Sequence, residues 1–155
     1  MPDKRIALVT GANQGVGLQV AKELVANGVT VLFGSRNFER GEAAAREIGA
    51  GAIALQLDVT DRVSIADAAE RVRKEFGRLD LLVQNAAISN TRKGRLSLQE
   101  YAQISRASNA SLDEVRTVWE TNVFGVLAVY QAMLPLLRES PDARIINVCR
   151  APSAP

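Results

Sequence analysis

Short apolar runs alternate along the chain with longer segments of mixed polarity. Continuous apolar runs of about five residues suit strands that are buried on both faces of a parallel sheet, and apolar positions three or four residues apart indicate helices. The pattern predicts strands at 6–10, 29–33, 52–57, 79–83 and 144–148. It predicts helices at 15–27, 38–48, 61–76 and 112–138. Because proline lacks an N–H group, we expect Pro135 to kink or tighten the end of the last helix.

Alternation of strand and helix over most of the chain is typical of an α/β fold whose parallel strands are joined by right-handed crossovers. Residues 86–110 interrupt this rhythm with a long polar segment, which we interpret as a loop. The next residues, Ser111 and Glu114, have the spacing of a capping box and predict the start of the long helix. No repeat or linker divides the chain, so we expect one domain over residues 1–148 and an irregular tail over 149–155.

Composition excludes several classes of function. The 155 residues include no histidine, which rules out Ser-His-Asp and Cys-His catalysis. Cys149 is the only cysteine, so no intrachain disulfide forms, and we predict no metal site. A net charge of +2 offers no basic stripe for nucleic acid. No apolar run reaches the ~18 residues of a membrane helix, and no signal-peptide pattern is present, so we expect a cytoplasmic protein without a membrane partner.

Three glycines, Gly11, Gly15 and Gly17, span the junction between the first predicted strand and the first predicted helix. In dinucleotide-binding folds this turn holds the pyrophosphate, because glycines allow close backbone approach and the helix N-terminus offers free N–H donors. The alternative is a flexible strand-to-helix turn that binds no ligand. The predicted cofactor contacts in this segment are Gly11, Asn13, Gln14, Gly15, Val16 and Gly17.

The TGxxxGxG spacing of this turn resembles the classical short-chain dehydrogenase/reductase family, and four later segments agree in order. These segments are Asp58-Val59, Gln84-Asn85-Ala86-Ala87, Thr121-Asn122-Val123 and Arg144-Ile145-Ile146-Asn147-Val148. The resemblance covers nearly the whole chain, from residue 5 to residue 148. It implies a Rossmann-type, doubly wound parallel sheet of five strands in the order 3-2-1-4-5, without the C-terminal part of the family fold.

The resemblance also implies roles for particular residues. Asp58 and Val59 would contact the adenine, Asn85 and Ala86 would border the cofactor, and Asn122 would be the family's catalytic asparagine, which holds a water connected to an active-site lysine. Each role has a structural alternative. Asp58 is also placed to cap a helix, Asn85 to bond its own backbone in a turn, and Asn122 to make a hydrogen bond that bends its helix.

The end of the second strand indicates which cofactor is preferred. A carboxylate at this position accepts a hydrogen bond from the ribose 2′-hydroxyl of NAD, whereas a neutral residue beside an arginine accommodates the 2′-phosphate of NADP. Here Ser35 and Arg36 occupy the position, and no acidic residue lies between Glu23 and Glu39. We therefore predict that NADP is preferred over NAD. The alternative is an ordinary solvated arginine.

The catalytic set of the family is incomplete in this sequence. Neither Tyr101 nor Tyr130 is followed four residues later by a lysine, and no lysine follows Lys93. The serine expected after the fifth strand is replaced by Cys149. The YxxxK pair is therefore missing, and Asn122 is the only catalytic residue present.

We interpret the chain as the cofactor-binding part of an NADP-dependent reductase of the carbonyl-reductase-like branch. The complete enzyme would transfer hydride between NADPH and a small ketone or aldehyde, or the corresponding alcohol, and the 155-residue chain alone is expected to be inactive. Because the resemblance stops abruptly after Val148, residues 149–155 are interpreted as a frameshift product. The alternatives are a non-catalytic NADP-binding or regulatory protein, and a module that pairs or oligomerises through helix 112–138.

Overall fold

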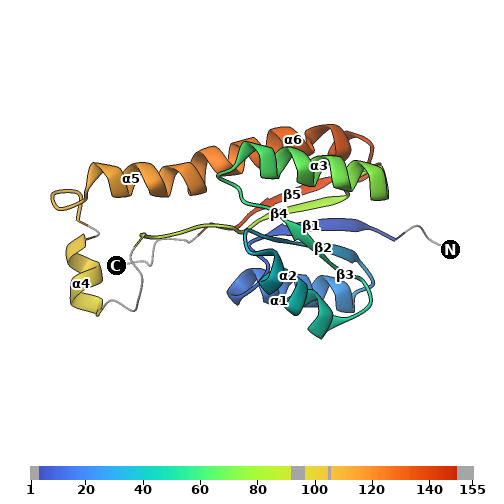
Figure 1. Ribbon diagram of the computed structural model, residues 1–155, viewed down its shortest axis with the longest axis horizontal. Helices are drawn as coiled ribbons and strands as arrows, with labels where there is room; N and C mark the ends of the chain where they lie inside the picture. The colour runs from blue at the N-terminus through green and yellow to red at the C-terminus, as the bar shows by residue number, and fades with distance from the viewer. Residues whose placement is uncertain (1–3, 92–96, 105, 150–155) are drawn as a thin grey trace.

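The computed structural model describes residues 4–91, 97–104 and 106–149, and these form a layered α/β structure (Figure 1). Its centre is one sheet of five parallel strands in the order β3-β2-β1-β4-β5. The predicted fold class and strand order are confirmed. The strands are β1 (Ile6–Thr10), β2 (Thr30–Ser35), β3 (Ala52–Gln56), β4 (Leu81–Gln84) and β5 (Arg144–Asn147).

Helices cover both faces of this sheet. Figure 1 shows α1 and α2 on one face and α3 and α6 on the other, while α5 and α4 extend beyond the end of the sheet. The helices are α1 (Gly15–Ala26), α2 (Phe38–Ile48), α3 (Arg62–Phe76), α4 (Leu98–Ile104), α5 (Leu112–Trp119) and α6 (Val126–Arg138).

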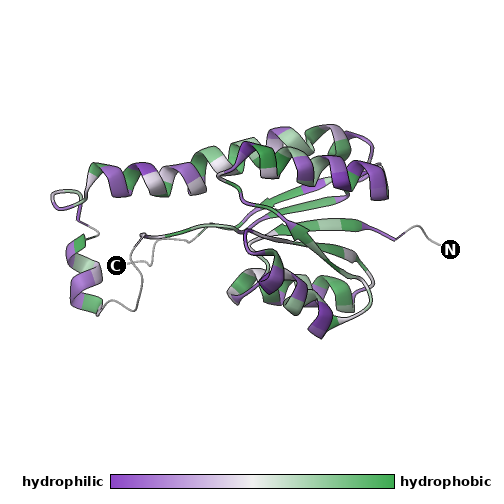
Figure 2. Ribbon diagram, viewed as in Figure 1, coloured by the Kyte–Doolittle hydropathy of each residue, from purple (hydrophilic) through white to green (hydrophobic). Residues whose placement is uncertain are grey.

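The hydrophobic core lies in two layers, one on each side of the central strand. All five residues of β1 are buried, as the continuous apolar run predicted. Because side chains alternate along a strand, Leu8 packs with the cluster under α3 and α6, and Val9 packs with the cluster under α1 and α2. Apolar colour follows the strands and the inward faces of the helices in Figure 2.

Several strand boundaries differ from the prediction by one or two residues. Strand β2 extends to Ser35, because Gly34 and Ser35 still pair with β3. Strand β4 begins at Leu81 instead of Leu79, because Leu79 donates its N–H to the carbonyl of Leu136 at the end of α6. Apolar character continues through these residues, so the sequence pattern cannot reveal where pairing within the sheet begins.

The predicted loop 86–110 contains a helix, α4, that sequence analysis missed. Its first turn contains a capping box, the motif that the sequence analysis placed at the start of the following helix. Ser97 Oγ accepts from the N–H of Glu100 at 3.2 Å, and the Glu100 carboxylate accepts from the N–H of Ser97 at 2.8 Å. Ser111 makes no side-chain cap at the start of α5, and the carboxylate of Glu114 instead accepts from Thr91. The predicted capping box at 111–114 is therefore wrong.

The long helix predicted over 112–138 is interrupted by a π-helical segment, η1 (Glu120–Gly125). Such segments occur mostly as single widened turns inside α-helices, frequently at functional sites. Gly125 passes close to the loop after β3, where an added Cβ would lie 2.7 Å from the carbonyl oxygen of Val59. Helix α6 then continues through Pro135 to Arg138.

The segment Leu112–Arg138 is long and apolar enough to cross a membrane by length and composition alone, with a mean hydropathy of 1.2 over an 18-residue window of which 28% is buried. This differs from the prediction, which counted only uninterrupted apolar runs. Core helices meet the same criterion, and α6 contributes four buried side chains to the core beneath it.

A buried carboxylate joins three strands at the amino edge of the sheet. Asp80 accepts from the N–H of Ile6 at 2.7 Å, from Ser140 Oγ at 2.6 Å and from Arg78 Nε at 3.1 Å. Its own carbonyl accepts from the N–H of Arg144, the first residue of β5. Burial raises the pKa of Asp80, but the hydrogen bonds from Ser140, Ile6 and Arg78 outweigh it, and the pKa falls below its ordinary value of 3.8.

We expect Asp80→Asn to lower the free energy of unfolding by about 1.5–3 kcal/mol at pH 7, because it removes hydrogen bonds to a charged, buried acceptor. A lowered folded-state pKa means that the stabilisation is present above the ordinary pKa and is lost as pH falls through the folded-state value. The difference in the free energy of unfolding between wild type and Asp80→Asn should therefore become smaller as the pH falls. Urea unfolding titrations at several pH values measure this difference. The exposed Asp67→Asn is the control, and a stability difference independent of pH would contradict the assignment.

Candidate dinucleotide site

A cleft of about 400 Å³ opens at the carboxyl edge of the sheet. Strand β1 has β2 on one side and β4 on the other, so the strand order reverses here. Open α/β sheets bind ligands at this position. The structure brings ten of the predicted residues together along its wall: Gly11, Asn13, Gln14, Gly15, Val16, Arg36, Asp58, Val59, Asn85 and Ala86. Sequence reasoning did not select five other lining residues: Leu57, Thr60, Ala87, Ile88 and Thr121.

The glycine turn places backbone donors at the edge of this cleft. Helix α1 begins at Gly15, and the preceding Gln14 makes no side-chain cap, so the first N–H groups of the helix are left for another acceptor. Gly11 and Gly15 have φ of 64° and 59°, the left-handed region that favours glycine. Free N–H donors at a helix N-terminus fit a diphosphate.

Gly17 does not line the cleft, but it allows the turn to close. A Cβ at this position would overlap the Asn85 side-chain nitrogen and the Gly11 carbonyl oxygen. The third glycine of the motif is thus required by the close packing of helix α1 against the turn and the end of β4.

A hydrogen-bonded crosslink holds the glycine turn against β4. Thr10 Oγ1 accepts from the N–H groups of Asn85 and Ala86, both at 3.0 Å. Asn85 Nδ2 in turn donates to the carbonyls of Thr10 and Gly11, each at 3.2 Å. The side chain of Asn85 therefore bonds a neighbouring strand and not its own turn, which excludes the turn-residue alternative. Thr10 completes this crosslink, although only its neighbouring glycines were selected from the sequence.

Asp58 does not cap helix α3. Asp61 does so, accepting from the N–H of Val63 at 2.9 Å. Asp58 Oδ1 instead accepts from the N–H and the hydroxyl of Thr60, at 2.9 and 2.7 Å, and the residue lines the cleft. The helix-cap alternative is excluded, and the predicted adenine contact remains compatible with this position.

The side chains of the two residues predicted at the end of β2 have different surroundings. Ser35 is 1% exposed, and its hydroxyl donates to the carbonyl of Asn37 at 2.7 Å, so it does not reach the cleft. Arg36 lines the cleft and makes no ion pair within the described part of the chain. The cation, and not its neutral neighbour, is available to a ligand.

Asn122 lies in the π-helical segment η1 and makes a pair of hydrogen bonds to one backbone residue. Its Oδ1 accepts from the N–H of Ile88 at 2.9 Å, and its Nδ2 donates to the Ile88 carbonyl at 2.7 Å. The side chain thus holds the chain after β4 against the long helix. These bonds reach a different segment of the chain, so they are not the helix-bending bond of the structural alternative, and the family role of Asn122 stays a prediction.

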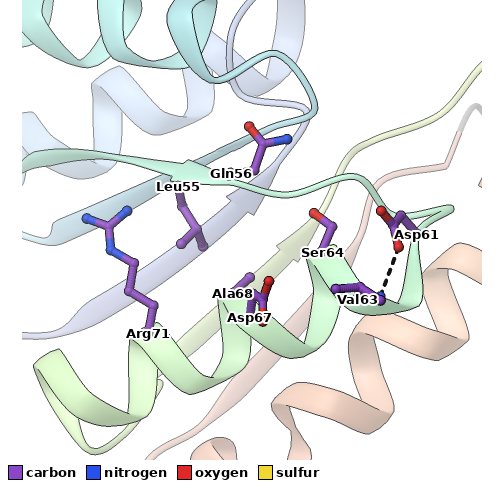
Figure 3. Close-up of a pocket in the computed structure, with 8 residues that line it drawn as sticks. All are labelled: Leu55, Gln56, Asp61, Val63, Ser64, Asp67, Ala68 and Arg71. Atoms are coloured by element: carbon purple, nitrogen blue, oxygen red, sulfur yellow. Dashed lines mark hydrogen bonds between the residues drawn. The ribbon is translucent and has the colours of Figure 1, made fainter.

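A second hollow, of about 320 Å³, lies between β3 and α3 at the outer edge of the sheet (Figure 3). Arg71 crosses this edge and donates to the carbonyl of Ala54 at 2.8 Å and to Glu75 at 2.8 Å. None of the predicted cofactor contacts lines this hollow.

The sheet order, the glycine turn and the cleft together define a dinucleotide-binding Rossmann-type domain. Comparison with known proteins gives its family: the short chain dehydrogenase model matches residues 5–152, and the chain belongs to this family of oxidoreductases, which bind nicotinamide dinucleotides. A short-chain dehydrogenase/reductase of Saponaria officinalis is 38% identical, over 96% of this chain and 53% of its own length.

Solved structures agree with this assignment. Menthone neomenthol reductase from Mentha piperita has a TM-score of 0.81 and 32% identity, and the match covers 93% of this chain and 60% of that protein. A 3-ketoacyl-(acyl-carrier-protein) reductase from Brucella melitensis, complexed with NADH, has a TM-score of 0.78 and 27% identity over 92% of this chain and 56% of its own. The chain therefore spans little more than half the length of the relatives that it matches.

Gly17→Ala tests the closure of the glycine turn. Helix propensity alone predicts a gain of about 1 kcal/mol, but overlap with a backbone oxygen that cannot rotate away costs about 1–3 kcal/mol beyond it. We expect a net loss of stability, measured by thermal melting, and a loss of nucleotide binding, measured by quenching of tryptophan fluorescence on titration with nucleotide. Gln19→Ala, on the exposed face of the same helix, is the control. A Gly17→Ala protein more stable than wild type would contradict the close packing.

Proposed function

We propose that this chain is the cofactor-binding part of an NADP-dependent reductase that acts on ketones or aldehydes. The observation that carries the cofactor preference is Arg36, a permanently charged side chain on the cleft wall with no carboxylate beside it at the end of β2. A guanidinium matches the geometry of a phosphate and is expected to bind the 2′-phosphate. Two relatives from Mentha piperita, named (-)-isopiperitenone reductase and menthone neomenthol reductase, support a small carbonyl compound as the substrate.

Different groups in the cleft would bind different parts of the cofactor. The first N–H groups of α1 would bind the diphosphate, Arg36 the 2′-phosphate, and Asp58 and Val59 the adenine. Asn122 would keep the segment after β4 in place beside the nicotinamide half of the site. When bound, the cofactor supplies the hydride, and the protein orients it and its substrate.

Carbonyl reduction also requires an acid that protonates the substrate oxygen. The family's tyrosine and lysine, spaced YxxxK, do not occur in these 155 residues, and Cys149 stands where a serine is expected. We propose that the chain binds cofactor without catalysing turnover, and that activity belongs to a longer protein.

A second candidate function is a module that pairs with a full-length relative through the segment Leu112–Arg138. The observation that favours it is a row of half-exposed apolar side chains along this segment, including Trp119, Phe124 and Leu127, which are 52%, 52% and 50% exposed. Such a module must form a stable complex with that relative, whereas a cofactor-binding domain need not.

Arg36→Ala should weaken binding of adenosine 2′,5′-bisphosphate by roughly ten- to a hundredfold, because it removes a charge-assisted pair worth about 1.5–3 kcal/mol. Binding of 5′-AMP, which lacks the 2′-phosphate, should be unchanged. Isothermal titration of both nucleotides against both proteins measures the difference. Equal affinities of the two proteins for the bisphosphate would refute the NADP assignment.

Purified 155-residue chain should oxidise no NADPH in the presence of a panel of ketones and aldehydes. General acid–base catalysis contributes about 10²–10⁴-fold, and its acid is missing. Absorbance at the reduced-nicotinamide band follows the reaction, with a complete ketone reductase as the positive control. Turnover that Asn122→Ala abolishes would show that the chain is itself an enzyme.

A further inference from the structure

The backbone around Arg36 is held from three directions. Ser35 donates its hydroxyl to the carbonyl of Asn37 at 2.7 Å, which closes the turn across Arg36. Asn37 caps α2 by accepting from the N–H of Arg40 at 2.9 Å. Gln56 Nε2 donates to the carbonyl of Arg36 itself at 3.0 Å. The last of these contacts comes from a different strand.

Gln56 is positioned for this contact by the register of the sheet. It is the last residue of β3 and stands opposite Ser35, the last residue of β2. Side chains alternate along a strand, and in Figure 3 Leu55 points toward α3 while Gln56 points away from it. The Gln56 amide is therefore on the α2 side of the sheet, where the chain turns through Arg36.

The opposite side of this turn is closed by packing. Gly41, in the first turns of α2, lies so near Ser35 that an added Cβ would stand 2.9 Å from the Ser35 Cβ. Ser35 is buried, so the turn has no room to move toward α2. The Gln56 amide holds the carbonyl of Arg36 from the other strand, and a fixed backbone at Arg36 sets the direction in which its Cα–Cβ bond leaves the chain.

We infer that Gln56 is a specificity-determining positioning residue, which orients Arg36 toward a 2′-phosphate without touching the nucleotide itself. The inference rests on the proposed NADP preference and adds a second residue to it. A neutral amide suits the task, because it donates to the carbonyl without placing a negative charge beside a phosphate. Gln56 acts only through Arg36, so it affects discrimination between nucleotides with and without the 2′-phosphate and leaves general nucleotide affinity unchanged.

Gln56→Met tests this role, since methionine keeps the length of the side chain and removes its donor. We expect affinity for adenosine 2′,5′-bisphosphate to fall by about two- to tenfold, the effect of one exposed hydrogen bond, with affinity for 5′-AMP unchanged. Gln56→Asn, which keeps the amide but shortens its reach, should show the same selective loss. Gln19→Met, at an exposed glutamine of α1, is the matched control and should bind both nucleotides as wild type does.

Titration calorimetry of all variants with both nucleotides, together with their melting temperatures, separates the outcomes. A selective loss at Gln56 in a protein with the wild-type melting temperature supports the inference. Unchanged bisphosphate affinity in Gln56→Met, or an equal loss for both nucleotides, overturns it. If Arg36→Ala itself leaves bisphosphate affinity unchanged, the proposed cofactor preference fails, and that failure is recognised before any Gln56 variant is compared.

Discussion

The position of β1 between β2 and β4 is the constraint on which the site depends. Every backbone polar group of a buried strand needs a partner, and β1 obtains its partners from a strand on each side. The chain leaves β1 toward β2 and returns on the other side as β4, so the loops at the carboxyl edge separate and leave a cleft. The hydrogen bonds between Thr10 and Asn85 join the two sides of that cleft at its base.

Charged groups are paired at the amino edge of the sheet, and Arg36 at the carboxyl edge is left without an ion-pair partner among the described residues. At the amino edge, the carboxylate of Asp80 is buried and saturated by Ile6, Arg78 and Ser140, which makes it a structural crosslink. At the carboxyl edge, Arg36 and the first amides of α1 have no such partners within the described residues. Donors and cations left without acceptors in this way define where an anionic ligand gains most.

Sequence patterns predicted the repeating parts of the fold and missed the parts that depend on single contacts. The apolar runs located all five strands, and the glycines located the turn that borders the cleft. The pattern S-x-x-E was assigned to Ser111 although the capping box forms at Ser97. Both sites have suitable residues, but Ser111 makes no side-chain cap, and the carboxylate of Glu114 accepts from Thr91 instead. The π-helical segment was likewise invisible, because its residues read as an ordinary amphipathic helix.

The sequence by itself determined the fold class and the glycine turn, because these follow from local periodicity and from the backbone freedom of glycine. The strand order and the other cleft residues near the ends of β3 and β4 came from the family resemblance. Tertiary structure alone decided what each polar side chain does. It buries Ser35 and leaves Arg36 in the cleft. It also places Asn85 in hydrogen-bonding distance of Thr10, Asn122 of Ile88, and Gln56 of the Arg36 carbonyl. An amide or a hydroxyl can bond any donor or acceptor within about 3 Å, and which groups come that close is set by strand register and helix packing across the whole domain.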